Sequence, residues 1–144
     1  MKKSIFFLLF SLAITGVWAQ TSLPTSFSDF SLPLPTGWTY LNNNGGASTY
    51  AVGSDATVAC RLDATAEYLE IFFSDVPGVL SYKMKGTAIS PNPPFSGTFT
   101  VQESIDGTTW TALQTFTTMN SAFTLYTNNV TSTSRYVRFV KLSK

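Results

Sequence analysis

Acidic side chains are the groups in this sequence that could do acid–base chemistry, because the chain has 144 residues and no histidine. Without histidine, the Ser-His and Cys-His nucleophile arrangements and the usual zinc ligands are excluded. Glycoside hydrolysis needs two facing carboxylates, one of them with a raised pKa. Glu67 and Glu70 lie three positions apart, so on a strand they point to opposite faces. The sequence therefore predicts a protein that is not an enzyme.

Loop carboxylates form a second candidate site, since Asp and Asn oxygens suit calcium. Asp75 and Asp106 fall in predicted turns, and Asp55 falls in a long predicted loop. Together with Asn128 or Asn129 they would form a calcium site at one end of the molecule. In the alternative interpretation, Asp75 and Asp106 accept hydrogen bonds within their own turns, as Asp commonly does. The sequence favours this alternative and leaves calcium as the candidate metal.

Sugar recognition would use exposed aromatic rings for stacking and polar neighbours for the hydroxyl groups. The four candidates for such a platform are Trp38, Tyr40, Tyr50 and Phe95. Tyr50 and Phe95 fall in predicted loops, where a large aromatic ring is harder to explain by packing. For Trp38 the sequence favours a core position. Trp110 directly follows a predicted turn, which also indicates the core.

Cys60 is the only cysteine, so no intrachain disulfide can form. One interpretation is a reactive or intermolecular thiol. The other is a small buried hydrophobic residue in the predicted strand 57–62. Free cysteine is commonly buried, and this favours the second interpretation.

Residues 1–19 have the features of a secretory signal peptide. Lys2 and Lys3 form a basic start, residues 5–14 an apolar core, and residues 17–19 a cleavage site of the small-residue type. The apolar run is shorter than the roughly 20 residues that span a bilayer, and no later stretch is apolar enough to do so. No cysteine follows for lipid attachment. We expect a secreted, periplasmic or cell-surface protein that is not a lipoprotein.

After loss of residues 1–19, seven basic and eight acidic side chains remain. This balance gives no basic footprint for nucleic acid. Residues 20–144 are long enough for one domain with a sizeable core, and residues 20–36 are predicted to form an extended N-terminal segment with a short first strand. The abundance of Thr, Ser and aromatic residues favours strands over helices.

Residues 97–110 are the central hairpin of the predicted fold. Phe99 and Val101 alternate with polar neighbours, and Asp106-Gly107 indicates a two-residue turn. Other strands are expected at 57–62, 68–73, 79–85, 123–127 and 135–142, with a further, bulged strand after Trp110. Glu70 and Glu103 are predicted as exposed, solubilising charges. Seven or eight strands at this spacing are typical of an antiparallel β-sandwich or jelly roll.

Antiparallel strands place the connecting loops at two ends of such a sandwich. One end collects the segments 42–55, 75–78, 104–109 and 128–134. Binding residues tend to lie on loops that a rigid scaffold displays. We therefore expect the binding site at this end.

Two motifs suggest a family. Ser104-x-Asp106-Gly107-x-Thr109-Trp110, which follows Val101-Gln102-Glu103, and the strand at 135–139 (RYVRF) together resemble the discoidin or coagulation-factor C-type module of the galactose-binding-like β-sandwich group. Segments 34–38 and 62–71 resemble jelly-roll modules of secreted proteins from Bacteroidetes-type bacteria. The resemblance covers about residues 30–141, and its motifs are structural rather than catalytic.

The resemblance implies a secreted, non-catalytic binding module that recognises carbohydrate through loops at one end of the sandwich. Such modules often continue beyond the RYVRF-like strand, whereas this chain stops at Lys144. An alternative is therefore a structural or adhesive sandwich with an unpaired edge strand that binds a protein partner. A truncated accessory module of a larger secreted enzyme is the third interpretation.

Overall fold

The computed structural model describes residues 20–43, 49–50, 56–86 and 95–143, which form β-strands and no helix. The strands are β1 (Trp38–Leu41), β2 (Thr49–Tyr50), β3 (Ala59–Cys60), β4 (Tyr68–Phe72), β5 (Val79–Met84), β6 (Thr98–Ser104), β7 (Thr111–Phe116), β8 (Thr124–Asn129) and β9 (Tyr136–Ser143). The predicted fold class, an all-β antiparallel sandwich, is confirmed. Its jelly-roll, galactose-binding-like type stays a prediction. The predicted signal peptide lies outside the described residues.

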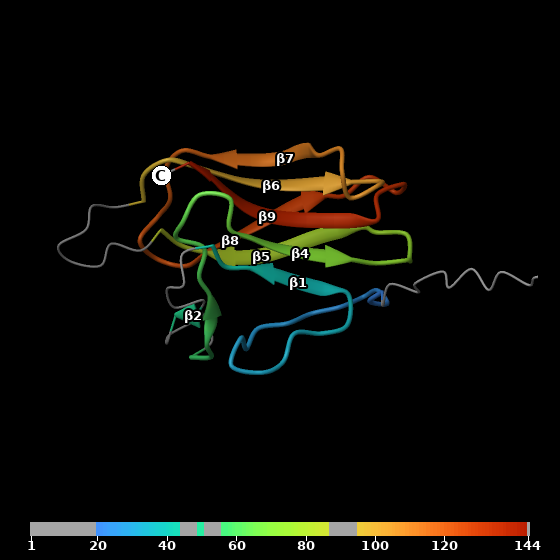
Figure 1. Cartoon of the computed structure of the whole chain (residues 1–144), viewed down its shortest axis with the longest axis horizontal. Helices are drawn as coiled ribbons and strands as arrows, with labels where there is room; N and C mark the ends of the chain where they lie inside the picture. The colour runs from blue at the N-terminus through green and yellow to red at the C-terminus, as the bar shows by residue number, and fades with distance from the viewer. Residues whose placement is uncertain (1–19, 44–48, 51–55, 87–94, 144) are drawn as a thin grey trace, which may run out of the picture.

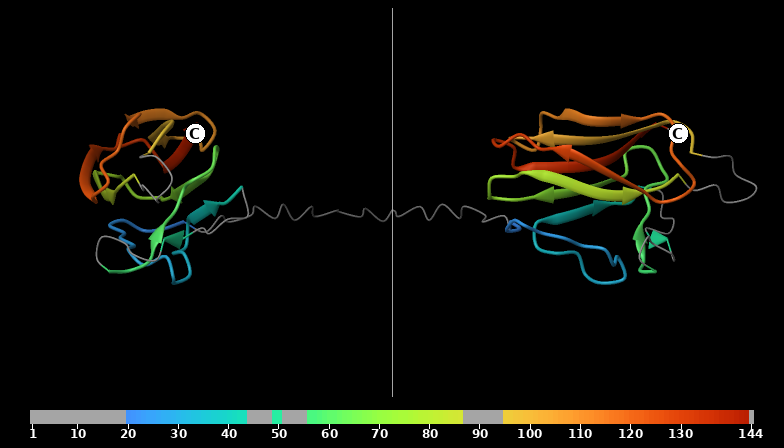
Figure 2. Two further views of the ribbon diagram at one scale, coloured as in Figure 1. Left: turned by 90° about the vertical axis from the view of Figure 1, so that its left-hand side faces the viewer. Right: turned by 180° about the vertical axis from the view of Figure 1, so that it is seen from behind.

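Two layers of unequal width make up the sandwich. Five strands pair in the order β1-β4-β9-β6-β7, whereas the opposite layer is the pair β5-β8, and β2 and β3 form a separate ribbon. Figure 1 shows the five-stranded sheet, and Figure 2 shows β5 and β8 to one side of it. In the part of the chain that the structure describes, β5 and β8 are thus the strands that cover the inner face of the larger sheet.

The last strand, β9, is central rather than at an edge. It pairs with β4 on one side and with β6 on the other. The unpaired edge strand that the sequence suggests is therefore not β9, and no partner strand can add there; among the described strands of this sheet, β1 and β7 stand at the edges. Because β4 and β6 both pair with β9 along most of its length, the C-terminal strand holds the sheet together.

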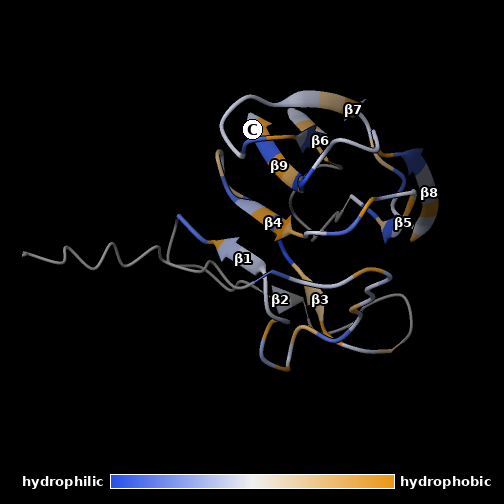
Figure 3. Ribbon diagram, turned by 90° about the vertical axis from the view of Figure 1, so that its right-hand side faces the viewer, coloured by the Kyte–Doolittle hydropathy of each residue, from blue (hydrophilic) through white to orange (hydrophobic). Residues whose placement is uncertain are grey.

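Alternation along the strands places the core as the sequence predicts. Leu69, Ile71 and Phe73 are buried on one face of β4, and Val101 of β6 is fully buried at 0% exposure. Figure 3 shows hydrophobic and hydrophilic residues alternating along β9. Val137 is buried in the same core cluster, which confirms its predicted direction.

The opposite layer covers this core through β5. Leu80, Tyr82 and Met84 pack against the cluster, as their alternation with polar residues predicts. The predicted bulge in the strand after Trp110 is also present. Val101 pairs with Gln114 and Gln102 pairs with Ala112, so Leu113 is the extra residue in β7.

The predicted two-residue turn at Asp106-Gly107 is wrong, because β6 ends at Ser104 and β7 begins at Thr111. The longer loop is closed by side-chain hydrogen bonds. Asp106 Oδ1 accepts from the backbone N–H groups of Thr108 and Thr109, both at 2.8 Å. These bonds hold the pKa of Asp106 well below its usual value. Asp106 therefore closes its own loop, the role that the sequence favoured over a metal ligand.

The N-terminal half departs most from the predicted strands. The expected strand 57–62 reduces to Ala59–Cys60, and the expected first strand before residue 36 is absent, leaving a single bridge between Thr21 and Phe73. Instead, β1 begins at Trp38, directly after Gly37, whose φ of +81° ends the preceding turn. Residues 20–36 thus run as an extended segment beside the sheet rather than as a strand of it.

Glu103 is not the exposed charge that the sequence predicts, since its exposure is 8%. It points from β6 toward the β8–β9 loop. There its carboxylate accepts hydrogen bonds from Thr131 N–H and Oγ1, both at 2.7 Å, and from Ser134 Oγ at 2.8 Å. Burial alone would raise the pKa of Glu103, but these hydrogen bonds outweigh it and lower the pKa. The carboxylate thus fixes that loop to the sheet.

Replacing Glu103 tests this role. We expect Glu103→Ala to lower the free energy of unfolding by about 3 kcal/mol, because three donors, among them the buried hydroxyl of Ser134, lose an ionised acceptor. Glu103→Gln, which keeps one acceptor oxygen, should cost less. The folded-state pKa lies below the ordinary value of 4.5, so the stabilisation is present above pH 4.5 and is lost as the pH falls through the folded-state pKa.

Urea unfolding at a series of pH values measures both effects. The stability difference between the natural chain and Glu103→Gln should shrink below pH 4.5. A difference that stays constant down to pH 3 would show that ionisation of Glu103 does not stabilise the fold.

Candidate functional site

The aromatic residues proposed for sugar stacking turn toward the interior. Trp38 and Tyr40 lie on the inner side of β1, paired with Ile71 and Leu69. The Trp38 ring is 5.6 Å from that of Phe27. Trp38 therefore occupies the core-type position that the sequence favoured for it.

Tyr40 and Phe95 have contacts within the fold as well. The Tyr40 hydroxyl donates a hydrogen bond to the Arg61 carbonyl at 2.7 Å. Phe95 is half-buried against the core cluster, and Lys141 Nζ lies 4.8 Å from the centre of its ring. Tyr50 ends β2, but its side chain lies outside what the structure describes. Trp38, Tyr40 and Phe95 therefore give no exposed platform at the loop end.

The proposed calcium ligands that the structure describes have hydrogen-bond partners within the fold. Asp75 Oδ2 accepts the backbone N–H of Leu23 at 2.6 Å and so ties the N-terminal segment to the β4–β5 turn. Asn128 Oδ1 lies 2.8 Å from the Tyr82 hydroxyl, and Asp55 lies outside the described residues. Among the residues described, no three His, Cys, Asp or Glu side chains gather to hold a metal ion. Asp75 and Asp106 each accept backbone hydrogen bonds, and a calcium site that uses them stays a prediction.

A different set of residues gathers on the outer face of the five-stranded sheet. Residues paired across antiparallel strands share a face. One row therefore contains Glu70, Arg138 and Gln102, and the next contains Phe72 and Tyr136. Tyr68 of β4 and Trp110, just before β7, complete the group. We call these seven residues the outer-face ladder; all are half-buried.

Arg138 is the centre of the outer-face ladder. Its guanidinium carbon lies 3.9 Å from the centre of the Trp110 ring and 5.7 Å from that of Tyr68. Arg138 Nε and Nη2 both donate to Gln102 Oε1, at 3.2 and 2.8 Å. A guanidinium between two aromatic faces is attracted by both rings. Trp110 is therefore a surface residue stacked on arginine, and its predicted core position is wrong.

The second row of the ladder is a pair of stacked rings. The rings of Phe72 and Tyr136 are 4.6 Å apart and nearly parallel, with an interplanar angle of 13°. Gly107 lies against the Tyr136 ring, since a Cβ there would be 3.0 Å from Tyr136 Cζ. The glycine thus lets the β6–β7 loop rest on the ladder. Trp110 is the last residue of this loop, so the contact of Gly107 with Tyr136 helps to position the Trp110 ring.

Glu70 supplies the negative charge of the ladder. Partial burial raises the pKa of Glu70, and the charge of Arg138 lowers it, with burial the larger effect. Burial likewise lowers the pKa of Arg138, while Glu70 raises it. The outer-face ladder therefore combines aromatic rings with one acid, one base and one amide in a partly dehydrated setting.

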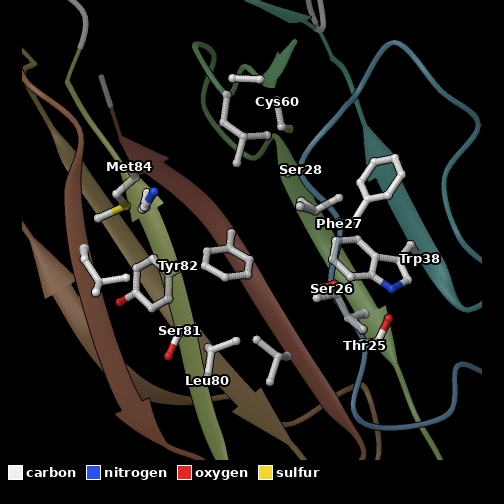
Figure 4. Close-up of a pocket in the computed structure, with 18 of the residues that line it drawn as sticks. Thr25, Ser26, Phe27, Ser28, Trp38, Cys60, Leu80, Ser81, Tyr82 and Met84 are labelled. Carbon is white, nitrogen blue, oxygen red and sulfur yellow. The ribbon is translucent and has the colours of Figure 1, made fainter. Parts of the chain in front are cut away.

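A cavity lies on the inner side of the sheet. It has a volume of about 1100 Å³ and separates β5 from the N-terminal segment. Figure 4 shows Leu80, Tyr82 and Met84 of β5 on one side, residues 25–28 and Trp38 on the other, and Cys60 near the Met84 end. We call this cavity the inner groove.

Comparison with known proteins gives no further assignment. No protein-family model matches the chain, and no curated protein matches it. Within the described residues, no helix has the length and apolar character of a membrane span.

The outer-face ladder could be found only in part from the sequence. Alternation in the last strand correctly turns Tyr136 and Arg138 away from Val137 and Phe139. This alternation does not show that Trp110, which lies 28 positions before Arg138, returns to the same face. The position of Trp110 depends on the length of the β6–β7 loop. The predicted two-residue turn is shorter than the observed loop, so the contact of Trp110 with Arg138 was not predicted.

The reactivity of Cys60 tests whether its thiol is buried on the inner side of the fold. Burial, and secondarily the charge of Glu67, raise the pKa of the thiol to about 12. Since the thiolate is the reactive form, we expect Ellman's reagent at pH 8 to label the folded protein at least about a hundredfold more slowly than the urea-unfolded chain. Equal labelling rates would show that Cys60 is an exposed, reactive thiol.

Proposed function

We propose that this protein is a secreted, non-catalytic carbohydrate-binding module and that the glycan binds on the outer-face ladder. The solvent-facing side of an antiparallel sheet normally carries short polar residues. Here it carries four aromatic side chains, Tyr68, Phe72, Trp110 and Tyr136, arranged around Arg138. These aromatic side chains on the solvent-facing side of the sheet are the observation that supports the proposal.

The ladder has the two kinds of group that a sugar requires. Apolar ring faces suit the C–H faces of a pyranose, and a few fixed polar groups orient its hydroxyls. Arg138 and Glu70 would supply a donor and an acceptor side by side, and Gln102 fixes the direction of the guanidinium. Because these side chains are held in place by strands and by stacking, little side-chain entropy is lost on binding.

The same residues argue against catalysis. Glu70 is the one carboxylate in the ladder, whereas glycoside hydrolysis needs a pair. The sequence also lacks histidine as an alternative base. The ladder would therefore hold a glycan without cleaving it.

The proposed site differs from the loop end that the sequence indicated. The resemblance to galactose-binding-like modules placed the glycan among loops. Trp38, Tyr40 and Phe95 instead contact the interior, and Asp75 and Asp106 bond to backbone N–H groups. On the outer sheet face, by contrast, four aromatic rings occur together with Arg138 and Glu70. The predicted signal peptide agrees with a role outside the cell, where glycans are displayed.

A glycan and polysaccharide array, followed by calorimetry on any glycan that binds, tests this proposal. We expect Trp110→Ala to weaken binding at least about tenfold, since it removes a stacking surface and the ring that holds Arg138. Leu125→Ala is the matched control, because Leu125 is 61% exposed on β8, in the opposite layer.

Circular dichroism of both variants confirms that each is folded. Two results would overturn the proposal: a folded protein that binds no glycan on the array, or glycan binding that Trp110→Ala leaves unchanged. Calcium and a chelator should be compared in the same assay, because the ladder requires no metal ion for binding.

A further inference from the structure

The inner groove exists because the two layers differ in width. β5 pairs with β8 along one side, and no other strand of the described residues pairs with its far side. The groove lining includes every residue from Asp75 to Gly86. It therefore runs along the far edge of β5 and not merely beneath its inward side chains.

Backbone groups of β5 point into this groove. The glycines at its two ends both bond toward the β8 side: Gly78 O accepts from Val130 N–H at 3.0 Å, and Gly86 N–H donates to Asn120 O at 2.8 Å. In an antiparallel pair, backbone groups alternate between the two sides of a strand. Since Gly78 and Gly86 are even-numbered, the N–H and C=O groups of Val79 and Ser81 point to the far edge.

Apolar side chains form the floor and walls of the groove. Ile71 and Val137 come from the sheet, and Leu80 comes from β5. Across the groove, Phe27 belongs to the extended N-terminal segment. An occupant must therefore present apolar side chains on one face and backbone hydrogen-bonding groups along one edge.

The charges along the groove are unequal at its two ends. Lys85 follows β5 at the Met84 end, and Lys141 reaches the same end, where its Nζ lies over Phe95 beside Gly86. At the other end, Asp75 precedes β5 and contacts Leu23. An acidic residue of an occupant is thus favoured at the Met84 end.

We propose that the inner groove binds an extended segment of a partner protein, which adds to the far edge of β5 as a strand. The segment would have apolar side chains at alternate positions, directed to the groove floor, and an acidic residue near Lys85 and Lys141. Strand addition of this kind combines main-chain hydrogen bonds with pockets for alternate side chains. The six residues of β5 give an edge of about 20 Å.

The backbone edge favours a peptide over a lipid. A long-chain fatty acid would fill the apolar groove and place its carboxylate near the lysines. However, it would leave the N–H and C=O groups of Val79 and Ser81 against hydrocarbon, and an unpaired polar group in an apolar setting is costly. An extended peptide meets both requirements, because it also supplies hydrogen bonds.

Synthetic peptides test the proposal on the purified protein. The probes are eight-residue peptides in which valine alternates with threonine. One peptide has aspartate at its N-terminus and another has aspartate at its C-terminus. In the matched version of each peptide, lysine replaces the aspartate. We expect an aspartate peptide to bind at least about tenfold more tightly than its lysine version and to shift the amide signals of Val79 and Ser81 in NMR spectra. A peptide N-methylated at alternate positions should not bind.

A pair of variants isolates the backbone contribution. Ser81→Pro removes the outward N–H of Ser81 and spares the β8 side, so peptide binding should fall at least about tenfold. Ser81→Ala keeps that N–H and should bind as the natural chain does. Trp110→Ala should also bind peptide normally, which separates this proposal from the glycan site.

Three results would overturn the proposal. The folded protein binds none of the peptides; the N-methylated peptide binds as well as its parent; or palmitate binds in the groove and displaces the peptide. The N-methylated probe alters the peptide and not the protein, so its result stands even where Ser81→Pro does not fold.

Discussion

The unequal width of the two layers is the constraint that shapes the inner side of this protein. Five strands present an inner face rich in large apolar side chains, and in the described part of the chain β5 and β8 stand opposite them. The extended N-terminal segment covers part of the remainder through Phe27, which packs on Trp38. Hydrophobic burial therefore explains why this segment lies against the sheet although it forms no strand.

The outer face of the five-stranded sheet is organised by a different interaction, the stacking of side chains across strands. It faces solvent, yet cross-strand stacking of Phe72 on Tyr136 and of Arg138 on Trp110 buries apolar area there. The ladder displays aromatic and charged groups that contact one another across the strands. We propose that the two faces bind two kinds of ligand: a glycan on the outer face, and an extended peptide on the inner side.

Local alternation made much of the fold predictable, whereas contacts set by loops were not. The periods of two in 68–73, 79–85 and 97–104 correctly gave the inward residues of β4, β5 and β6. The edge strand β1 was missed, because its pairing with β4 depends on the long-range contact of Trp38 with Ile71. The burial of Glu103 was not predicted, because its hydrogen-bond partners, Thr131 and Ser134, come from a loop distant in the sequence. Neither contact has a local signal in the sequence.

Hydrogen exchange of individual β5 amides in the protein without ligand would show whether the far edge of β5 is open. We expect Leu80 and Tyr82, whose N–H groups face β8, to exchange slowly, and Val79 and Ser81, whose N–H groups face the inner groove, to exchange at least about tenfold faster. Equal protection at all four amides would show that a strand already pairs with the far edge of β5. The two layers would then be closer in width, and the inner groove would not be open.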